Sequence, residues 1–265
     1  MELPPELLDD IISYIPPDDY QSLQNCSLVA KPWVYPSRRR IFKTVNLRRV
    51  TRQELWLATI SPTNVEVLQH VRSLICRIAD APDSPRPSAD PLRDYLPSFD
   101  HLERLTFFSG FLPSLTQIGT YSAFQHTLSC ISLQYCRATA SALVALVDYF
   151  PNLTHLDLSK ISLWVDDQPA LPFSRPLQKL TIADLYSDGG LVLLDQLMGL
   201  RPQCDEVSIG MYGTSCPSLA QRVIKGVNAS VKRLNLKSDL AGESSVPKKG
   251  VVEVSERNAG IPSQG

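Results

Sequence analysis

The stretch LSCISLQYCRATASALVALVDYFPNLTHLDL, residues 128–158, begins and ends with the same spacing of apolar residues, L-x-x-L-x-L. Apolar residues at alternate positions are typical of a strand. Between the two copies, residues 138–150 repeat apolar side chains every three or four positions, which is the spacing of one helical face. The stretch therefore predicts a strand, a helix, and a second strand that begins the unit again.

The same triplet of apolar residues recurs along most of the chain. Its eight copies are Phe42-Val45-Leu47, Val71-Leu74-Cys76, Leu102-Leu105-Phe107, Leu128-Ile131-Leu133, Leu153-Leu156-Leu158, Leu177-Leu180-Ile182, Cys204-Val207-Ile209 and Val231-Leu234-Leu236. The central residues of successive copies lie 24 to 31 positions apart, with a mean of 27, which is the spacing of leucine-rich repeats. We expect an α/β fold: a curved solenoid, most regular from about residue 100, with parallel strands on its concave side and helices outside.

Helical patterns occupy other intervals between the triplets. Residues 217–228 place apolar side chains on one face, and residues 92–99 do so over a shorter length. Thr51 with Glu54 predicts the start of an earlier helix. The proline-rich residues 79–91 fall in the longest interval, and we expect them to form an inserted loop.

The positions between the apolar residues of each triplet are polar and mixed in charge. In a solenoid they line the extended concave surface on which such proteins bind partners. We expect contacts to a target protein from Arg104, Gln134, His155, Asp157 and Lys179.

A second candidate surface is the proline-rich segment LWVDDQPALPFSRP, residues 163–176, where we expect Trp164 and Phe173 to be exposed beside Asp166 and Asp167. Loops often carry function, and tryptophan is enriched among the residues that dominate binding energy. Trp164 is therefore predicted to contact the target. The alternative is that Trp164 closes the edge of a repeat, because large aromatic side chains are mostly buried.

The N-terminal segment LPPELLDDIISYIPPDDY, residues 3–20, predicts an amphipathic helix between two proline pairs. Its aliphatic residues share one broad face and are Leu7, Leu8, Ile11, Ile12 and Ile15. An ordinary core helix is the simplest interpretation of this periodicity. The other helices of so short a segment can hardly bury both sides of such a wide apolar stripe. Part of the stripe is therefore expected to contact a partner protein.

Residues 3 to about 47 as a whole resemble the fungal form of the F-box. The matching features are Leu-Pro-x-Glu, aliphatic pairs at helical spacing, the stretch CSLV, a tryptophan, and an arginine-rich turn that ends in Phe42. The resemblance implies a three-helix module that docks on the Skp-family adaptor of a cullin-RING ubiquitin ligase. The positions that match this interface are Leu3, Pro4, Leu7, Leu8, Ile11, Ile12 and Ile15, with Val29 and Trp33 where the family packs its third helix. Residues 128–158 also resemble the cysteine-containing repeats of F-box proteins.

Composition and charge exclude several other classes. No apolar run approaches the roughly 20 residues of a membrane span, and the start MELPPELLDD lacks the basic flank of a signal peptide, so we expect a cytoplasmic or nuclear protein. Residues 1–20 carry six acids and no base, while residues 31–52 carry eight bases and no acid. The basic segment raises nucleic-acid binding as a hypothesis, but the pI of 6.4 argues against it.

Enzymatic and metal-binding motifs are not found in the sequence. The four histidines and six cysteines have no metal-ligand or nucleophile spacing, and the cysteines are expected to be free thiols. We therefore expect no catalysis, no metal and no cofactor.

The sequence predicts a substrate receptor of an SCF-type ubiquitin ligase, with an F-box over 1–47 and repeats over 48–240. The partners expected are the adaptor, a cullin bound through it, and an unidentified target protein. The alternative is a repeat scaffold with no role in ubiquitination. Residues 241–265 are expected to be disordered, unless GVVEVSE, residues 250–256, adds an edge strand.

Overall fold

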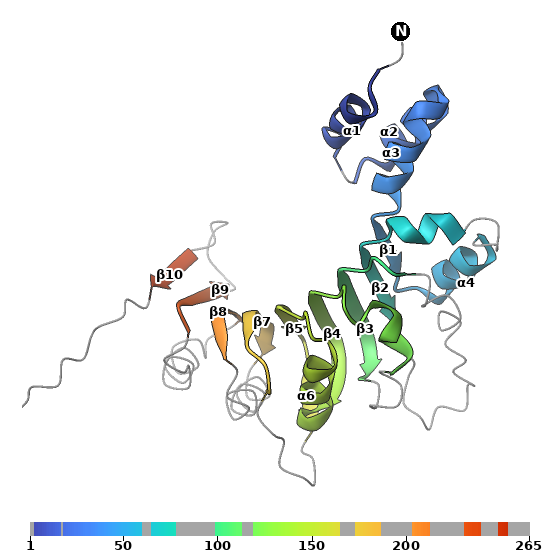
Figure 1. Ribbon diagram of the computed structural model, residues 1–265. Coiled ribbons are helices and arrows are strands. Elements are labelled where there is room, and N and C mark those ends of the chain that lie inside the picture. The colour runs from blue at the N-terminus through green and yellow to red at the C-terminus, as the bar shows by residue number, and fades with distance from the viewer. Residues whose placement is uncertain are drawn as a thin grey trace, which may run out of the picture.

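The computed structural model describes residues 3–16, 18–59, 65–77, 99–112, 119–164, 173–186, 203–212, 231–239 and 249–253. The chain has an α/β fold built on one open, mostly parallel sheet (Figure 1). The helices are α1 (Pro5–Ser13), α2 (Tyr20–Val29), α3 (Lys31–Ile41), α4 (Val50–Thr59) and α6 (Ala140–Tyr149), with 3-10 helices η1 (Val65–His70) and η3 (Gly119–Phe124). The strands are β1 (Thr44–Leu47), β2 (Ser73–Arg77), β3 (Arg104–Phe111), β4 (Cys130–Thr139), β5 (His155–Ser159), β6 (Ser162–Trp164), β7 (Leu177–Tyr186), β8 (Cys204–Tyr212), β9 (Arg233–Asp239) and β10 (Lys249–Glu253).

Strand order in the sheet follows the sequence, β1-β2-β3-β4-β5-β7-β8-β9-β10, and β6 pairs with the far end of β4. All pairs are parallel except β9 with β10. The register aligns the central residues of all eight predicted triplets in one row: Val45, Leu74, Leu105, Ile131, Leu156, Leu180, Val207 and Leu234. The third residues of the triplets align in a second row. Because a slip of one residue would turn every side chain to the other face, this alignment gives the sheet one apolar face.

The apolar face is covered by the segments that connect the strands. Helix α6 contributes Leu143, Val144, Leu146 and Val147 to the same core as the strand residues. The hydroxyl of Thr139 caps this helix by accepting a hydrogen bond from the Ala142 N–H at 3.2 Å. The predicted helix over 138–150 is therefore confirmed. A helix is also found at the start predicted from Thr51 and Glu54, but α4 begins at Val50, so Thr51 lies in its first turn instead of capping it.

A row of buried phenylalanines precedes the strands. Its members are Phe99, Phe124, Phe150 and Phe173, each three or four residues before the first apolar residue of a triplet. The expectation that Phe173 is exposed is wrong, because its ring is packed in the core beneath the sheet. The carbonyls of Phe99, Phe124 and Phe150 accept a hydrogen bond from that residue's N–H, at 3.1 to 3.2 Å. The rings of Phe124 and Phe150 are parallel, with centroids 6.4 Å apart. A short turn, closed over three residues after Phe99 and Phe150 and over four after Phe124, thus precedes these strands, and a buried aromatic ring accompanies each turn.

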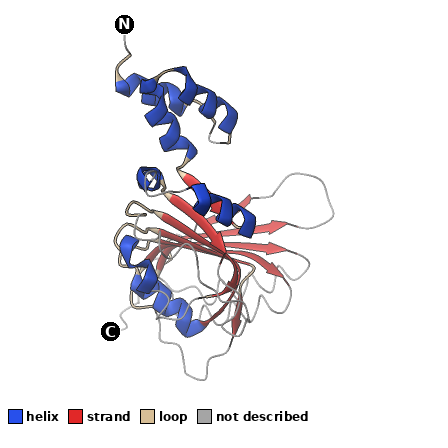
Figure 2. Cartoon of the chain, turned by 90° about the vertical axis from the view of Figure 1, so that its right-hand side faces the viewer, coloured by secondary structure: helices blue, strands red, loops and turns tan. Residues whose placement is uncertain are grey.

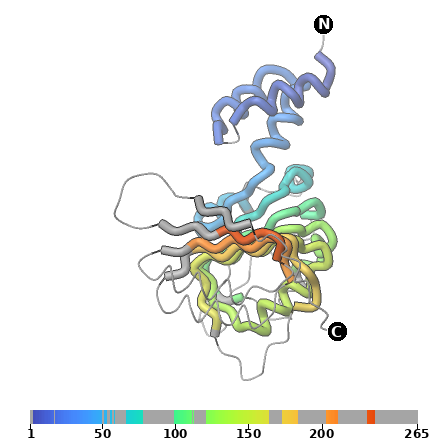
Figure 3. The backbone as a smooth tube through the Cα atoms, turned by 90° about the vertical axis from the view of Figure 1, so that its left-hand side faces the viewer, coloured from blue at the N-terminus to red at the C-terminus, as the bar shows by residue number. Residues whose placement is uncertain are grey.

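Helices α1, α2 and α3 lie beyond the β1 end of the sheet, as Figures 2 and 3 show from opposite sides. They enclose a small core of their own, formed by Leu8, Ile12 and Leu23, which is separate from the core beneath the sheet. Helix α3 leads directly into β1 and packs against η1. The N-terminal helices are therefore a distinct packing unit attached to the first strand.

Residues 249–253 differ from the disordered segment expected over 241–265. They form β10, which pairs antiparallel with β9, so that Val251 lies opposite Asn235. An edge strand formed by GVVEVSE was the alternative to disorder in the sequence analysis. The remaining residues of 240–265, and the segments 79–91, 92–98 and 217–228, lie outside the described residues.

No helix within the described ranges combines the length and the apolar character that crossing a membrane requires.

Candidate protein-interaction surfaces

Helix α1 exposes part of the aliphatic stripe and buries the rest. Leu8 is 3% exposed and Ile12 is 1% exposed, whereas Leu7 is 48% exposed and Ile11 is 43% exposed. We call the exposed set the α1 stripe; it consists of Leu3, Leu7, Ile11 and Tyr14. The prediction that Leu8 and Ile12 reach a partner is wrong, because their side chains form the core that holds the three helices together.

The other predicted adaptor contacts are divided in the same way. Pro4 and Val29 are exposed, while Ile15 and Trp33 are half-buried within the helical unit. Further exposed apolar side chains on α2 and α3, not expected from the sequence, are Tyr20, Leu28 and Tyr35. The helices thus present an apolar surface that extends beyond the α1 stripe.

Polar contacts hold α1 against α3. Arg39 forms an ion pair with Asp9 at 3.6 Å, and Arg40 donates a hydrogen bond to the Ile15 carbonyl at 2.7 Å. Tyr35 of α3 meets the buried His70 edge to face, with ring centroids 5.0 Å apart. Burial lowers the pKa of His70, and Arg39 adds to the effect. A neutral imidazole is therefore packed where the helical unit meets the sheet.

A cleft of about 760 Å³ separates the helical unit from the first strands. Four acids and four bases line it; they are Asp9, Asp10, Asp18 and Glu103, and Arg39, Arg40, Lys43 and Arg72. Its charges are balanced, so the cleft favours neither an anion nor a cation.

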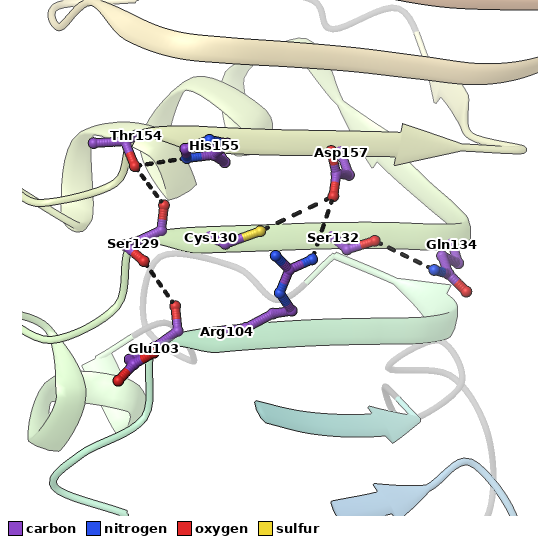
Figure 4. A network of polar contacts seen from close by, with 9 residues as sticks. All are labelled: Glu103, Arg104, Ser129, Cys130, Ser132, Gln134, Thr154, His155 and Asp157. Carbon is purple, nitrogen blue, oxygen red and sulfur yellow. Dashed lines mark hydrogen bonds and ion pairs between the residues drawn. The ribbon is translucent and has the colours of Figure 1, made fainter. Parts of the chain in front are cut away.

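The side of the sheet opposite the apolar core carries polar side chains, and we call it the polar face. Figure 4 shows its centre, where Arg104 of β3 lies 3.9 Å from the Asp157 carboxylate of β5. Gln134 donates to the Ser132 hydroxyl at 3.3 Å on the intervening strand. The ring of His155 lies 2.8 Å from the Thr154 hydroxyl. Four predicted target contacts, Arg104, Gln134, His155 and Asp157, therefore lie together on three adjacent strands.

Lys179, the fifth predicted contact on this face, belongs to a second charged cluster centred on Glu206. The Lys179 ammonium is 2.9 Å from the Glu206 carboxylate, and the Arg233 guanidinium is 3.1 Å from it. Asn235 donates a further hydrogen bond to Glu206 at 3.2 Å. The hydrogen bond from Lys179 is the main cause that lowers the pKa of Glu206 below its ordinary value of 4.5.

We expect Glu206→Gln to lower the free energy of unfolding by about 1–2 kcal/mol at pH 7, because a carboxylate that is only 13% exposed loses its charge-assisted contacts. A folded-state pKa below the unfolded value gives stability that is present above the unfolded pKa and is lost as the pH falls through the folded pKa. The difference in free energy of unfolding between this variant and the unsubstituted protein should therefore shrink below pH 4.5. Urea unfolding at several pH values measures it.

The matched control is Asp205→Asn, since Asp205 is half-exposed and pairs with the exposed Lys232. We expect that change to cost less than about 0.5 kcal/mol. Equal effects of the two substitutions at pH 7 would contradict the assigned role of Glu206.

A group of cationic and aromatic side chains lies on the polar face just past the apolar triplets: Arg48 and Lys160 directly follow β1 and β5, whereas Phe108 and Tyr135 lie within the longer β3 and β4. The Arg48 guanidinium lies 4.6 Å from the Phe108 ring centroid, and the Phe108 and Tyr135 centroids are 5.2 Å apart. The Lys160 ammonium lies 4.8 Å from the Tyr135 centroid and donates to its hydroxyl at 2.8 Å. We call this group the strand-end ridge. Sequence reasoning named only Arg48, as part of the basic segment 31–52, and missed Phe108, Tyr135 and Lys160. The signal in the sequence was that each of the four comes one or two positions after a triplet.

Trp164 lies at the end of β6, where its backbone pairs with Thr139 of β4. Its side chain and residues 165–172 lie outside the described residues, so both interpretations of Trp164 remain predictions.

The buried cysteines are packed as small apolar side chains. Burial raises the pKa of Cys130 and Cys136 to about 11 and that of Cys204 to about 12. These thiols stay protonated at neutral pH and are poor nucleophiles. They are free of disulfide bonds.

Comparison with models of known protein families gives no match, and comparison with the sequences of curated proteins gives none either.

Proposed function

We propose that this chain is a non-catalytic substrate receptor of an SCF-type, cullin-RING ubiquitin ligase. In this proposal, residues 1–47 are an F-box that docks on a Skp-family adaptor, and residues 48–240 are a leucine-rich-repeat solenoid that binds a target protein on its concave face. A separate ubiquitin-conjugating enzyme supplies the chemistry. The receptor acts in the cytoplasm or the nucleus.

The exposed apolar stripe of α1 is the observation that carries the proposal. Leu8 and Ile12 already stabilise the helical unit, so its own core does not require Leu7 or Ile11. Contiguous exposed apolar side chains on a soluble domain usually mark an interaction site. Arg39 and Arg40 fix α1 on α3, which keeps the stripe in a defined orientation for a partner.

Co-purification with a Skp-family adaptor and a cullin tests this function. We expect the full-length chain to retain both proteins through size-exclusion chromatography, and a chain that lacks residues 1–17 to retain neither. A full-length chain that does not hold the adaptor, or a truncated chain that still does, would refute the F-box assignment. Circular dichroism of the truncated chain checks that the sheet is still folded.

A repeat scaffold without a role in ubiquitination is the second candidate, because the polar face supports protein binding whatever happens to the target. The two functions differ in the fate of the bound protein. If this chain is a ligase receptor, its binding partner has a longer half-life in cells that lack the chain. An unchanged half-life favours the scaffold.

A further inference from the structure

We propose that the strand-end ridge, Arg48, Phe108, Tyr135 and Lys160, is the docking site for an acidic, extended segment of a partner protein. The segment carries aspartate or glutamate on either side of an apolar residue. The inference rests on the proposed function in one respect: it takes this partner to be the target protein that the ligase marks for degradation. The binding itself is independent of the adaptor.

The backbone at the ridge is held in a conformation that ordinary residues avoid. Ser109, Tyr135 and Lys160 have φ values of 61°, 57° and 52°. They follow residues that are paired across β3, β4 and β5, so they occupy one equivalent position on three neighbouring strands. A left-handed conformation costs a residue with a side chain roughly 1–2 kcal/mol. The same unfavourable conformation thus recurs at equivalent positions of three neighbouring strands. It brings Tyr135 and Lys160 into contact.

The side chains of the ridge are ordered before any partner arrives. Arg48 reaches from the end of β1 to β4, where it donates a hydrogen bond to Gln134 at 3.1 Å, and its guanidinium also contacts the Phe108 ring. The Tyr135 hydroxyl is held by Lys160, yet 49% of Tyr135 remains exposed. Side chains that are already fixed lose less entropy on binding. Tyrosine and arginine are also the residues most often found at the energetic centres of interfaces.

Charge determines the class of partner. Among the described residues, the two positions after the triplets of β1 to β5 hold four bases, Arg48, Arg49, Arg77 and Lys160, and no acid. On the neighbouring β7 the same positions are Ala183, which pairs with Ser159, and Asp184, so bases outnumber acids four to one. The acids Asp157 and Glu206 lie nearer the amino ends of the strands, and each is paired with a base. The ridge is therefore positively charged, which favours a negatively charged partner.

The arrangement fits a peptide better than a nucleic acid or a single phosphate. Two aromatic rings stand between the Arg48 guanidinium and the Lys160 ammonium. Carboxylates spaced along an extended peptide can meet both cations, with an apolar side chain against Phe108 and Tyr135. Phosphate-tracking surfaces are rich in bases across a whole domain, whereas this chain has a net charge of −1.

Fluorescence anisotropy with the full-length chain, without adaptor, tests the proposal. Four labelled probes are compared. The acidic pool consists of 12-residue peptides with a central leucine among random aspartate and glutamate, and the basic pool has lysine and arginine in their place. The third pool consists of otherwise neutral peptides with one central phosphoserine, and the fourth probe is oligouridine RNA. We expect the acidic pool to bind best and to weaken as salt rises. Tyr135→Ala and Lys160→Ala should each weaken its binding about tenfold or more. Tyr135→Phe, which keeps the ring, should retain most of it.

The matched control is Lys232→Ala, which removes an exposed base just before β9, outside the strand-end ridge and the predicted target contacts, and should leave affinity for the acidic pool within about twofold. Preferential binding of the phosphoserine pool or of RNA would overturn the proposal. So would acidic-pool binding that Tyr135→Ala and Lys160→Ala leave intact in variants whose urea unfolding is unchanged. Failure to bind the adaptor in the co-purification would refute the F-box assignment but would not change the anisotropy result. Failure of the proposed function and failure of the ridge proposal are therefore distinguishable.

Discussion

Replacing Leu7 and Ile11 together by aspartate should weaken binding of a Skp-family adaptor at least about 100-fold while the chain stays folded. Each buried aliphatic side chain contributes roughly 1.5–3 kcal/mol to association, and an unpaired carboxylate at the same place opposes it further. Both side chains are nearly half exposed in the unbound chain, so the substitutions leave the core of Leu8, Ile12 and Leu23 unchanged. Isothermal titration calorimetry with purified adaptor measures the loss.

Leu55→Asp is the matched control for this double variant. Leu55 is 68% exposed on α4, outside the helical unit that docks in the proposal, so adaptor affinity should not change. Full adaptor binding by the double variant would mean that the α1 stripe is not the docking surface. Equal losses in the double variant and the control would mean that added charge acts nonspecifically.

Phe124→Ala should lower the free energy of unfolding by about 3–5 kcal/mol. Phe124 is completely buried and its ring contacts Tyr121 within its own segment and Phe150 of the following unit. The substitution therefore leaves a cavity between two neighbouring units, and each of these units is stabilised by packing against the other. Urea unfolding followed by circular dichroism gives the change.

Tyr135→Ala provides the comparison, since Tyr135 also contacts a phenylalanine but lies half exposed on the polar face. We expect it to cost less than about 1 kcal/mol. A similar cost for both substitutions would show that the phenylalanine row does not hold neighbouring units together.

The repeated strands could be predicted because their signal is local. The second and third apolar residues of each triplet are two positions apart, and in all eight triplets these two residues lie on the paired strands, aligned in register. Only that register buries the apolar residues of every strand on one face. The phenylalanine row has a local signal too, since each member precedes its triplet by three or four residues, but it was not included in the repeat pattern.

The division of the α1 residues could not be predicted from periodicity. Leu7, Leu8, Ile11, Ile12 and Ile15 form one wide stripe on a helical wheel. Which side of the stripe is buried depends on where α2 and α3 pack, and these contacts are made by residues distant in the sequence. The expectation that the module alone hardly covers the whole stripe is consistent with the exposed Leu7 and Ile11.

By itself, the amino-acid sequence determined the positions of the strands, their common spacing and the amphipathic character of the first helix, because backbone periodicity and side-chain burial act over a few residues. Only the tertiary structure decided which side of that helix stays exposed, and that Arg48 meets Phe108 and Gln134 across intervening strands. It likewise decided that Tyr135 meets Lys160. Such contacts depend on the parallel pairing of the strands, which brings residues from different units side by side on one face of the sheet. No local pattern encodes which of them will touch.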